Sequence, residues 1–168
     1  KKVVLTSISY DHTELLGNKL EDILRQKLYI SNNIDLLFIG DIQKDLINNI
    51  HRNYNHIILT NNIRDYLHEK NIDIENITSR EKNQYLAIMA LDVLLEEKSF
   101  DDLISIKLPN NPGRFEIIQN EPLKIIDGAH NIEGVERLLS DFGQLNDSLF
   151  VDLFIGFKKF NLLPLTES

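Results

Sequence analysis

Residues 35–40, Asp-Leu-Leu-Phe-Ile-Gly, form the stretch that limits the fold most narrowly. A short apolar run between an aspartate and a glycine is typical of a strand buried on both faces. Similar runs occur at 3–6, Val-Val-Leu-Thr, and at 56–60, His-Ile-Ile-Leu-Thr. Together the three runs predict neighbouring strands of one sheet.

The segments between these runs carry apolar residues at helical spacing. They cover residues 20–27, 42–50 and 63–69, and a longer, buried helix is expected over 79–97. Parallel strands need long crossover connections, which are usually helices. The alternation of strands and helices therefore favours an α/β fold with a mainly parallel sheet.

A second segment begins after a cluster of turn-forming residues, Pro-Asn-Asn-Pro-Gly at 109–113. Two prolines and a glycine in so short a stretch indicate a loop and a domain boundary. Beyond it the apolar run 123–126 leads through a polar turn into an amphipathic helix, and another strand is expected over 148–157. We expect residues 1–108 and 109–168 to belong to two domains, the second of them small and Rossmann-like.

Composition excludes several classes of function. The chain has 168 residues, a net charge of −8 and only 18 Lys and Arg, which argues against a broad nucleic-acid-binding face. The absence of cysteine excludes disulfides, thiolate zinc sites and a cysteine nucleophile. No stretch approaches the roughly 18 apolar residues of a membrane helix. We expect a soluble cytoplasmic protein without a membrane partner.

The first polar cluster lies in the segment 6–17, which follows the opening strand. Ligands of open α/β sheets bind outside the carboxyl ends of the strands, so Asp11 and His12 are well placed for a metal or a phosphate. The alternative is that Asp11 caps a turn and His12 is a solvated loop residue. From this stretch alone both interpretations stay open.

Lys27 could share a site with His12 only if the chain reverses between them, because a continuous helix would separate the two by about 22 Å. Gly17 permits such a reversal. Asn18 and Glu21 then resemble a capping box that starts the next helix. Taken alone, Lys27 is better explained as a surface lysine.

The third cluster joins Arg114 to the sequence Asp-Gly-Ala-His-Asn at 127–131. Asp127 ends a strand, and His130 lies at a helix N-terminus, whose free N–H groups attract phosphate. Arg114 offers a fork of donors that can clamp a phosphoryl group. The alternative is an ordinary strand-to-helix turn in which Asn131 caps the helix.

Five motifs in this order resemble folylpolyglutamate synthase, which is often bifunctional with dihydrofolate synthase, in the Mur ligase superfamily. The motifs are Thr-Ser-Ile-Ser-Tyr-Asp-His-Thr-Glu-Leu-Leu-Gly at 6–17, Lys27, Asn83 in Asn-Gln-Tyr-Leu-Ala-Ile-Met-Ala-Leu, Pro-Gly-Arg-Phe-Glu at 112–116 and Asp-Gly-Ala-His-Asn at 127–131. The order of five motifs is more specific than any one of them. The resemblance implies an ATP-dependent ligase that adds L-glutamate to folate through an acyl phosphate.

The resemblance also implies roles for individual residues. His12 would be a ligand of Mg²⁺, and Lys27 would bind the same ion as a carbamate, since hard magnesium prefers oxygen donors. Asn83 would contact the adenine of ATP and Asp127 the ribose or metal region. Arg114 and His130 would act on the phosphates and at the acyl-transfer site, so that His130, Arg114 and Lys27 form the expected catalytic set.

Family members are longer and carry a phosphate-binding P-loop, whereas none of the seven glycines here lies in a P-loop pattern. The sequence therefore resembles the second half of the family's ATPase domain and the start of its carboxyl-terminal domain. We expect the isolated chain to be a poor enzyme that needs an amino-terminal P-loop segment. Two alternatives are a degenerate relative that binds nucleotide or folate without turnover, and a Mur-type ligase of cell-wall precursors.

Overall fold

A computed structural model of the chain describes residues 1–10, 13–54, 56–95, 99–106 and 111–145. Its centre is a three-stranded parallel sheet in the order β1-β2-β3. The strands are β1 (Lys2–Leu5), β2 (Leu36–Ile39) and β3 (Ile58–Asn62). The α/β class, the parallel sheet and the three predicted strands are thereby confirmed.

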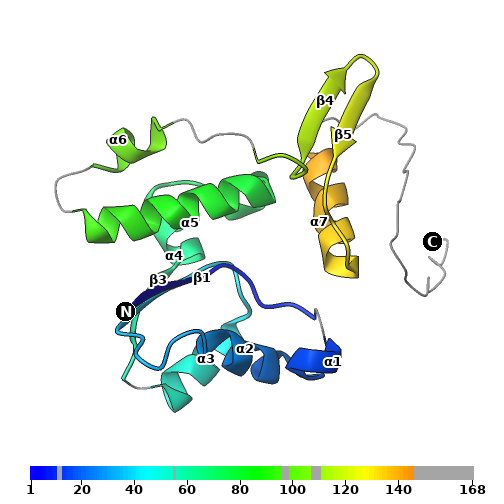
Figure 1. Cartoon of the computed structure of the whole chain (residues 1–168). Helices are drawn as coiled ribbons and strands as arrows, with labels where there is room; N and C mark the ends of the chain where they lie inside the picture. The colour runs from blue at the N-terminus through cyan, green and yellow to red at the C-terminus, as the bar shows by residue number, and fades with distance from the viewer. Residues whose placement is uncertain (11–12, 55, 96–98, 107–110, 146–168) are drawn as a thin grey trace.

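Helices cover both faces of this sheet (Figure 1). On one face lie α2 (Leu20–Leu28) and α3 (Lys44–Asn53), preceded by the short α1 (Thr13–Leu16). On the other face lie α4 (Ile63–Glu69) and α5 (Ser79–Leu94). The 3₁₀-helix η1 (Ile74–Asn76) and the helix α6 (Phe100–Ile104) complete this part of the chain. The four predicted helices are found within a few residues of their expected bounds.

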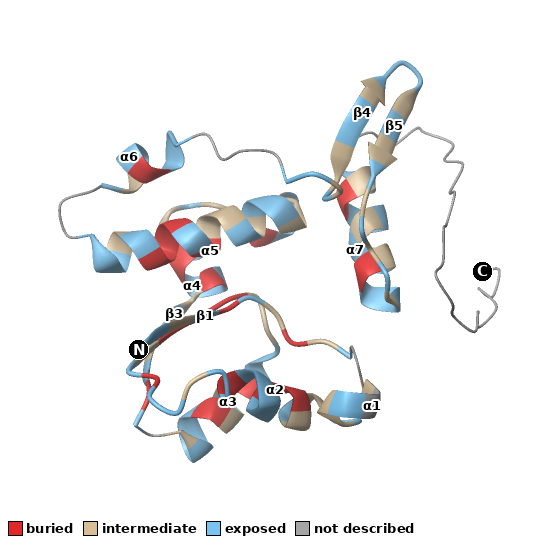
Figure 2. Ribbon diagram, in the orientation of Figure 1, coloured by how far each residue is buried: buried red, intermediate tan, exposed pale blue. Residues whose placement is uncertain are grey.

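The apolar core is divided between the two faces of the sheet, as the buried residues of Figure 2 show. Ile23 and Leu24 of α2 pack with Leu37 of β2 on one side. Phe38, the next residue of β2, packs with Leu67 of α4 on the other side. Successive residues of a strand point to opposite faces, so the central strand β2 contributes to both clusters.

Two sequence-based expectations were wrong in detail. The strands are not all buried on both faces, because β1 and β3 are the edges of the described sheet and Ile58 is 66% exposed. The capping box at Asn18 does not form either. The N-cap of α2 is Lys19, without a side-chain hydrogen bond, and the buried residues Ile23 and Leu24 hold the helix in place by packing.

The carboxyl-terminal described segment consists of a β-hairpin and a helix. Strands β4 (Glu116–Asn120) and β5 (Leu123–Ile126) pair antiparallel, and α7 (Ile132–Gly143) follows. The sequence predicted β5 and α7 but not β4, whose two apolar residues are adjacent and give no strand periodicity. The strand expected over 148–157 lies outside the described residues.

A buried carboxylate joins this segment to the sheet domain. Asp141 of α7 is 7% exposed, and its Oδ1 accepts hydrogen bonds from the backbone N–H of Ser79 at 2.8 Å and from its hydroxyl at 3.1 Å. Ser79 is the first residue of α5, where N–H groups lack partners within the helix. The Asp141 side chain of α7 therefore provides the hydrogen-bond acceptor for a free N–H group at the start of α5.

Replacement of Asp141 by alanine is expected to destabilise the chain by about 1–3 kcal/mol, the usual effect of leaving a buried donor without an acceptor. The free energy of unfolding in urea measures this loss. Glu136→Ala is the matched control, because Glu136 is an exposed acid of the same helix. Equal effects of the two substitutions would show that the contact with Ser79 contributes no stability.

Candidate functional site

A cavity of about 170 Å³ lies where the end of β1, the helix α2, the loop before β4 and the start of α7 meet. Its walls are almost entirely polar and carry more basic than acidic side chains. The lining includes Lys27, Arg114, His130 and Arg137 as basic groups, Glu133 as the one acid, and the hydroxyl residues Ser7 and Ser9. We refer to it as the basic cavity.

Lys27 reaches the basic cavity from the last turn of α2. Its Nζ donates a hydrogen bond to the backbone oxygen of Ser7 at 3.1 Å, directly after β1. The chain reverses at Gly17, whose φ of +102° lies in the region that glycine tolerates best. The chain reversal that a site shared by Lys27 and His12 would need is therefore present.

Arg114 is presented by a loop that approaches the turn after β5 closely. Gly113 has a φ of +67°, and its carbonyl accepts a hydrogen bond from the N–H of Gly128 at 2.8 Å. A Cβ added to Gly128 would lie 3.4 Å from the Gly113 oxygen and 3.5 Å from Arg114 Nη1. The loop and the turn are therefore in van der Waals contact at Gly128, and the backbone hydrogen bond holds them together.

Asp127 fastens the same two segments together. One carboxylate oxygen accepts from the backbone N–H of Phe115 at 2.7 Å, and the other accepts from that of Ala129 at 2.7 Å. Both oxygens are thus used to hold the loop that carries Arg114 against the turn that carries His130. Asp127 does not line the basic cavity.

His130 is held at the start of α7. Its Nδ1 lies 3.0 Å from the backbone oxygen of Gly128, an interaction that is a hydrogen bond when Nδ1 carries the proton. The side chain of Asn131 accepts from the N–H of Gly134 at 2.7 Å and is the N-cap of the helix. The predicted capping role of Asn131 is confirmed, and it coexists with a place for His130 in the cavity lining.

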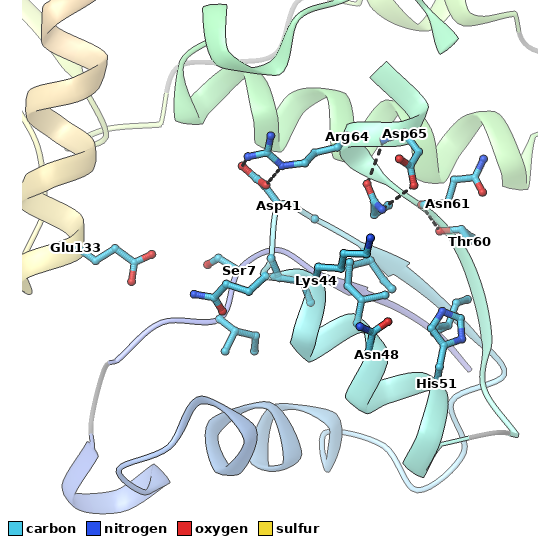
Figure 3. A pocket seen from close by; sticks show the side chains of 18 residues that line it. Ser7, Asp41, Lys44, Asn48, His51, Thr60, Asn61, Arg64, Asp65 and Glu133 are labelled. Carbon is cyan, nitrogen blue, oxygen red and sulfur yellow. Dashed lines mark hydrogen bonds and ion pairs between the residues drawn. The ribbon is translucent and has the colours of Figure 1, made fainter. Parts of the chain in front are cut away.

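A larger cavity of about 800 Å³ adjoins the basic cavity at the carboxyl ends of the three parallel strands. Ser7 and Glu133 line both cavities. Figure 3 shows Lys44, Asn48 and His51 projecting from α3 on one side and Glu133 coming from α7 on another. This is the crevice in which ligands of open α/β sheets usually bind.

An ion-pair cluster fixes one wall of the larger cavity. The guanidinium of Arg64 donates to both carboxylate oxygens of Asp41, at 2.6 and 3.2 Å (Figure 3). It also donates to a carboxylate oxygen of Glu75 at 2.7 Å. Lys82 Nζ lies 3.4 Å from the same Asp41. The hydrogen bond to Glu75 and the pairing with Asp41 raise the pKa of Arg64. The cluster ties the loop after β2 to α4 and α5.

The structure brings together three of the residues that the sequence singled out, Lys27, Arg114 and His130, around one cavity. Asn83 is an exposed residue of α5 and lines neither of the two cavities. His12 lies outside the described residues. Asp127, as its hydrogen bonds show, supports the site rather than lining it.

Several lining residues were not assigned a role from the sequence. Arg137 and Glu133 project from α7, and their spacing of four residues within the predicted helix was the signal that could have found them as neighbours. Ser7 lies within the quoted segment 6–17 but carried no assignment of its own. The Asp41 cluster could have been sought from Gly40-Asp41, which ends a strand as Asp127-Gly128 does.

The described residues do not by themselves make a metal site. No group of three or more His, Asp or Glu side chains within the described ranges is arranged to hold an ion. Residues with oxygen donors, namely Ser7, Ser9 and Glu133, line the same cavity as Lys27. Lys27 itself donates a hydrogen bond as an amine. An amine that is protonated cannot ligate a metal ion.

Comparison with known proteins shows that most of this chain is similar to part of a longer protein. No family model matches the sequence. The chain is 28% identical over 169 aligned residues to a protein of Bacillus subtilis (strain 168), and the match covers 84% of this chain and 39% of the relative. That relative is named dihydrofolate synthase/folylpolyglutamate synthase.

The chain resembles part of folylpolyglutamate synthase. A solved point mutant of L. casei FPGS superposes with a TM-score of 0.64 at 19% identity, covering 88% of this chain and 43% of that one. An FPGS–AMPPCP–folate complex gives a TM-score of 0.61 at 18% identity with the same coverage. At such identities the structures show the shared α/β fold. The chain spans about two fifths of the length of these relatives.

No helix within the described part of the chain is long and apolar enough to span a membrane.

Proposed function

We propose that this chain contributes to an ATP-dependent ligase that joins L-glutamate to folate, as a folylpolyglutamate or dihydrofolate synthase. The observation that carries the proposal is the convergence of Lys27, Arg114 and His130 on the basic cavity. These residues come from three separate segments and match three separate motifs of the family. The curated relative and the solved neighbours bear the names of such enzymes, one as a complex with AMPPCP and folate.

In the proposed reaction a carboxylate oxygen of folate attacks the γ-phosphorus of ATP, and ADP leaves. The amine of glutamate then attacks the carbonyl carbon of the acyl phosphate, the C–O bond to phosphate breaks, and the amine loses a proton as the amide forms. Arg114 holds the phosphoryl oxygens, because a guanidinium fork is suited to the charge that develops on them. His130, which lines the same cavity as Arg114, orients the acyl phosphate and accepts the proton.

The proposal also covers the contacts with the nucleotide and the division of the chain into two domains. Asn83 contacts the adenine of ATP, and Asp127 acts at the ribose or metal region through the turn that it stabilises. We assign residues 1–108 to an ATP-binding domain and 109–168 to the start of a carboxyl-terminal domain. The partners are folate, L-glutamate and a P-loop-bearing segment, and the proposed location is the cytoplasm.

Mg²⁺ is the metal that this chemistry implies. We propose His12 and the carbamate of Lys27 as its ligands, because carbamylation converts the amine into an oxygen donor of the kind that Mg²⁺ prefers. When bound, the ion would offset negative charge on the phosphates. Mn²⁺ can replace Mg²⁺ as a probe that electron paramagnetic resonance detects. Loss of bound Mn²⁺ in the variant His12→Ala would support this assignment without an activity measurement.

Carbamylation of Lys27 makes activity dependent on carbon dioxide. Depletion of carbon dioxide is expected to lower the rate of glutamate addition by the chain complemented with a P-loop segment, and added bicarbonate is expected to restore it. Lys27→Ala is expected to abolish both the activity and the response to bicarbonate. Lys19→Ala, at the exposed start of the same helix, is the control. A bicarbonate response that persists in Lys27→Ala would show that another group is carbamylated.

The proposed function is tested by ATP-dependent incorporation of labelled glutamate into tetrahydrofolate. The purified chain is assayed alone and together with the P-loop segment of a family member, and circular dichroism confirms that it is folded. Incorporation in the second arm supports the proposal. Binding of ATP without incorporation in either arm would favour a non-catalytic relative, and transfer to a cell-wall precursor in place of folate would favour a Mur-type ligase.

A further inference from the structure

Arg137 lines the basic cavity from α7, the helix that follows His130, and no ion pair of its side chain is described. We propose that it is a second anion-binding arginine, which together with Arg114 holds a phosphate-type dianion. The identification of this dianion with the transferred phosphoryl group rests on the proposed function. The binding of a phosphate-type dianion by the two arginines does not.

The position of Arg137 follows from the geometry of α7. Gly134 and Arg137 are three residues apart in α7, so they lie on one side of the helix, and both line the cavity together with His130, which precedes the N-cap. The helix is anchored at both ends of this stretch, by the Asn131 cap and by the contact between Asp141 and Ser79. Arg137 is therefore carried by a segment that is fixed against the sheet domain.

The charges around the basic cavity are not neutralised within the described residues, because Glu133 is the one acid in its lining. Neither the Arg114 nor the Arg137 side chain has a described hydrogen bond or ion pair, whereas Arg25 and Arg64 are paired with carboxylates. This occurs in a chain with 26 acidic and 18 basic residues, in which acidic partners are abundant. A small cavity with two such arginines and Lys27 favours binding of a multiply charged anion.

A phosphate group fits these donors better than a carboxylate does. The two guanidinium groups approach from different elements, the loop before β4 and the helix α7. Each can donate two parallel hydrogen bonds. A tetrahedral phosphate dianion offers enough oxygens for both forks, whereas a carboxylate has only two oxygens. Inorganic phosphate and the phosphates of a nucleotide share this chemistry.

The test is a titration of the full chain followed by NMR, with inorganic phosphate, ATP and glutarate as separate ligands. Arg137→Ala and Arg114→Ala are each expected to weaken phosphate binding by about tenfold or more, as for loss of a charge-assisted hydrogen bond. Arg137→Lys is expected to recover part of the affinity, because it keeps the charge but not the fork. Glutarate is expected to bind more weakly than phosphate.

Arg52→Ala is the matched control. Arg52 is an exposed arginine of α3 that also has no described ion pair and lines neither cavity. Equal affinities of Arg137→Ala and Arg52→Ala for both phosphate and ATP would overturn the inference, as would a native chain that binds neither ligand. An effect of Arg137→Ala with ATP alone would assign the site to nucleotide phosphates and support the inference.

The outcomes also separate this inference from the proposed function. Phosphate binding that depends on Arg137 in a chain that never incorporates glutamate would contradict only the ligase proposal. Incorporation of glutamate with phosphate and ATP binding that are indifferent to Arg137 would contradict only the present inference. Arg137 is exposed on α7, so neither Arg137→Ala nor Arg137→Lys is expected to disturb folding. Circular dichroism of each variant separates a loss of binding from a folding defect.

Discussion

Replacement of Arg114 by alanine is expected to lower kcat for glutamate addition by about 10²–10³-fold, the usual effect of removing one group that stabilises developing charge. Arg114 lies in the basic cavity on a loop held by Asp127, and no described carboxylate competes for its guanidinium. Its proposed partner is the transferred phosphoryl group. The charge on that group changes during the reaction, so the loss should fall on kcat.

Steady-state kinetics of the complemented chain measure this effect, with the KM for folate as the second readout. Folate does not depend on Arg114 for binding in this proposal, so its KM should change little. Arg52→Ala is expected to retain native kinetics, since Arg52 lines neither cavity. A large increase in KM with an unchanged kcat would place Arg114 in the folate pocket instead.

Replacement of Gly40 by alanine is expected to destabilise the fold by about 1–3 kcal/mol or more, as overpacking does in other cores. Gly40 follows β2, and its N–H donates to the backbone oxygen of Leu5 at 2.8 Å. A Cβ at this position would lie 2.2 Å from the backbone oxygen of Thr6. Backbone atoms cannot move aside as a flexible side chain can, so the segment after β1 must shift.

Urea unfolding of Gly40→Ala measures the loss, and Gly143→Ala is the matched control. Gly143 ends α7, and a Cβ there would meet no atom within 4 Å. Alanine also has the higher helix propensity, so this variant should keep or gain stability. Equal free energies of unfolding for the two variants would contradict the close approach of Gly40 to β1.

The sheet was predictable from sequence because its central strand is a continuous apolar run, Leu36–Ile39, with residues that pack on both faces. The edges were less predictable. Exposure of Ile58 depends on which strands are neighbours, and that information is not local. The pairing of β4 with β5 depends likewise on a tertiary contact, and β4 alone has too weak a pattern to be recognised.

The site was predictable only in part. Lys27, Arg114 and His130 were singled out because each matches a motif of the family that the sequence resembles, and the structure places them around one cavity. Arg137 belongs to no quoted motif, and its role emerges only when α7 is seen against α2 and the end of β1. The double hydrogen bonding of Asp127 also required three-dimensional geometry, since Phe115 lies twelve residues earlier.

The measurement that tests the central proposal most directly is the transfer of ¹⁸O from substrate to phosphate. Folate labelled with ¹⁸O in the reacting carboxylate is incubated with ATP, L-glutamate, the chain and a P-loop segment of a family member. Formation of an acyl phosphate predicts that the phosphate released with the new amide carries one ¹⁸O atom. Amide formation with unlabelled phosphate would contradict the acyl-phosphate mechanism.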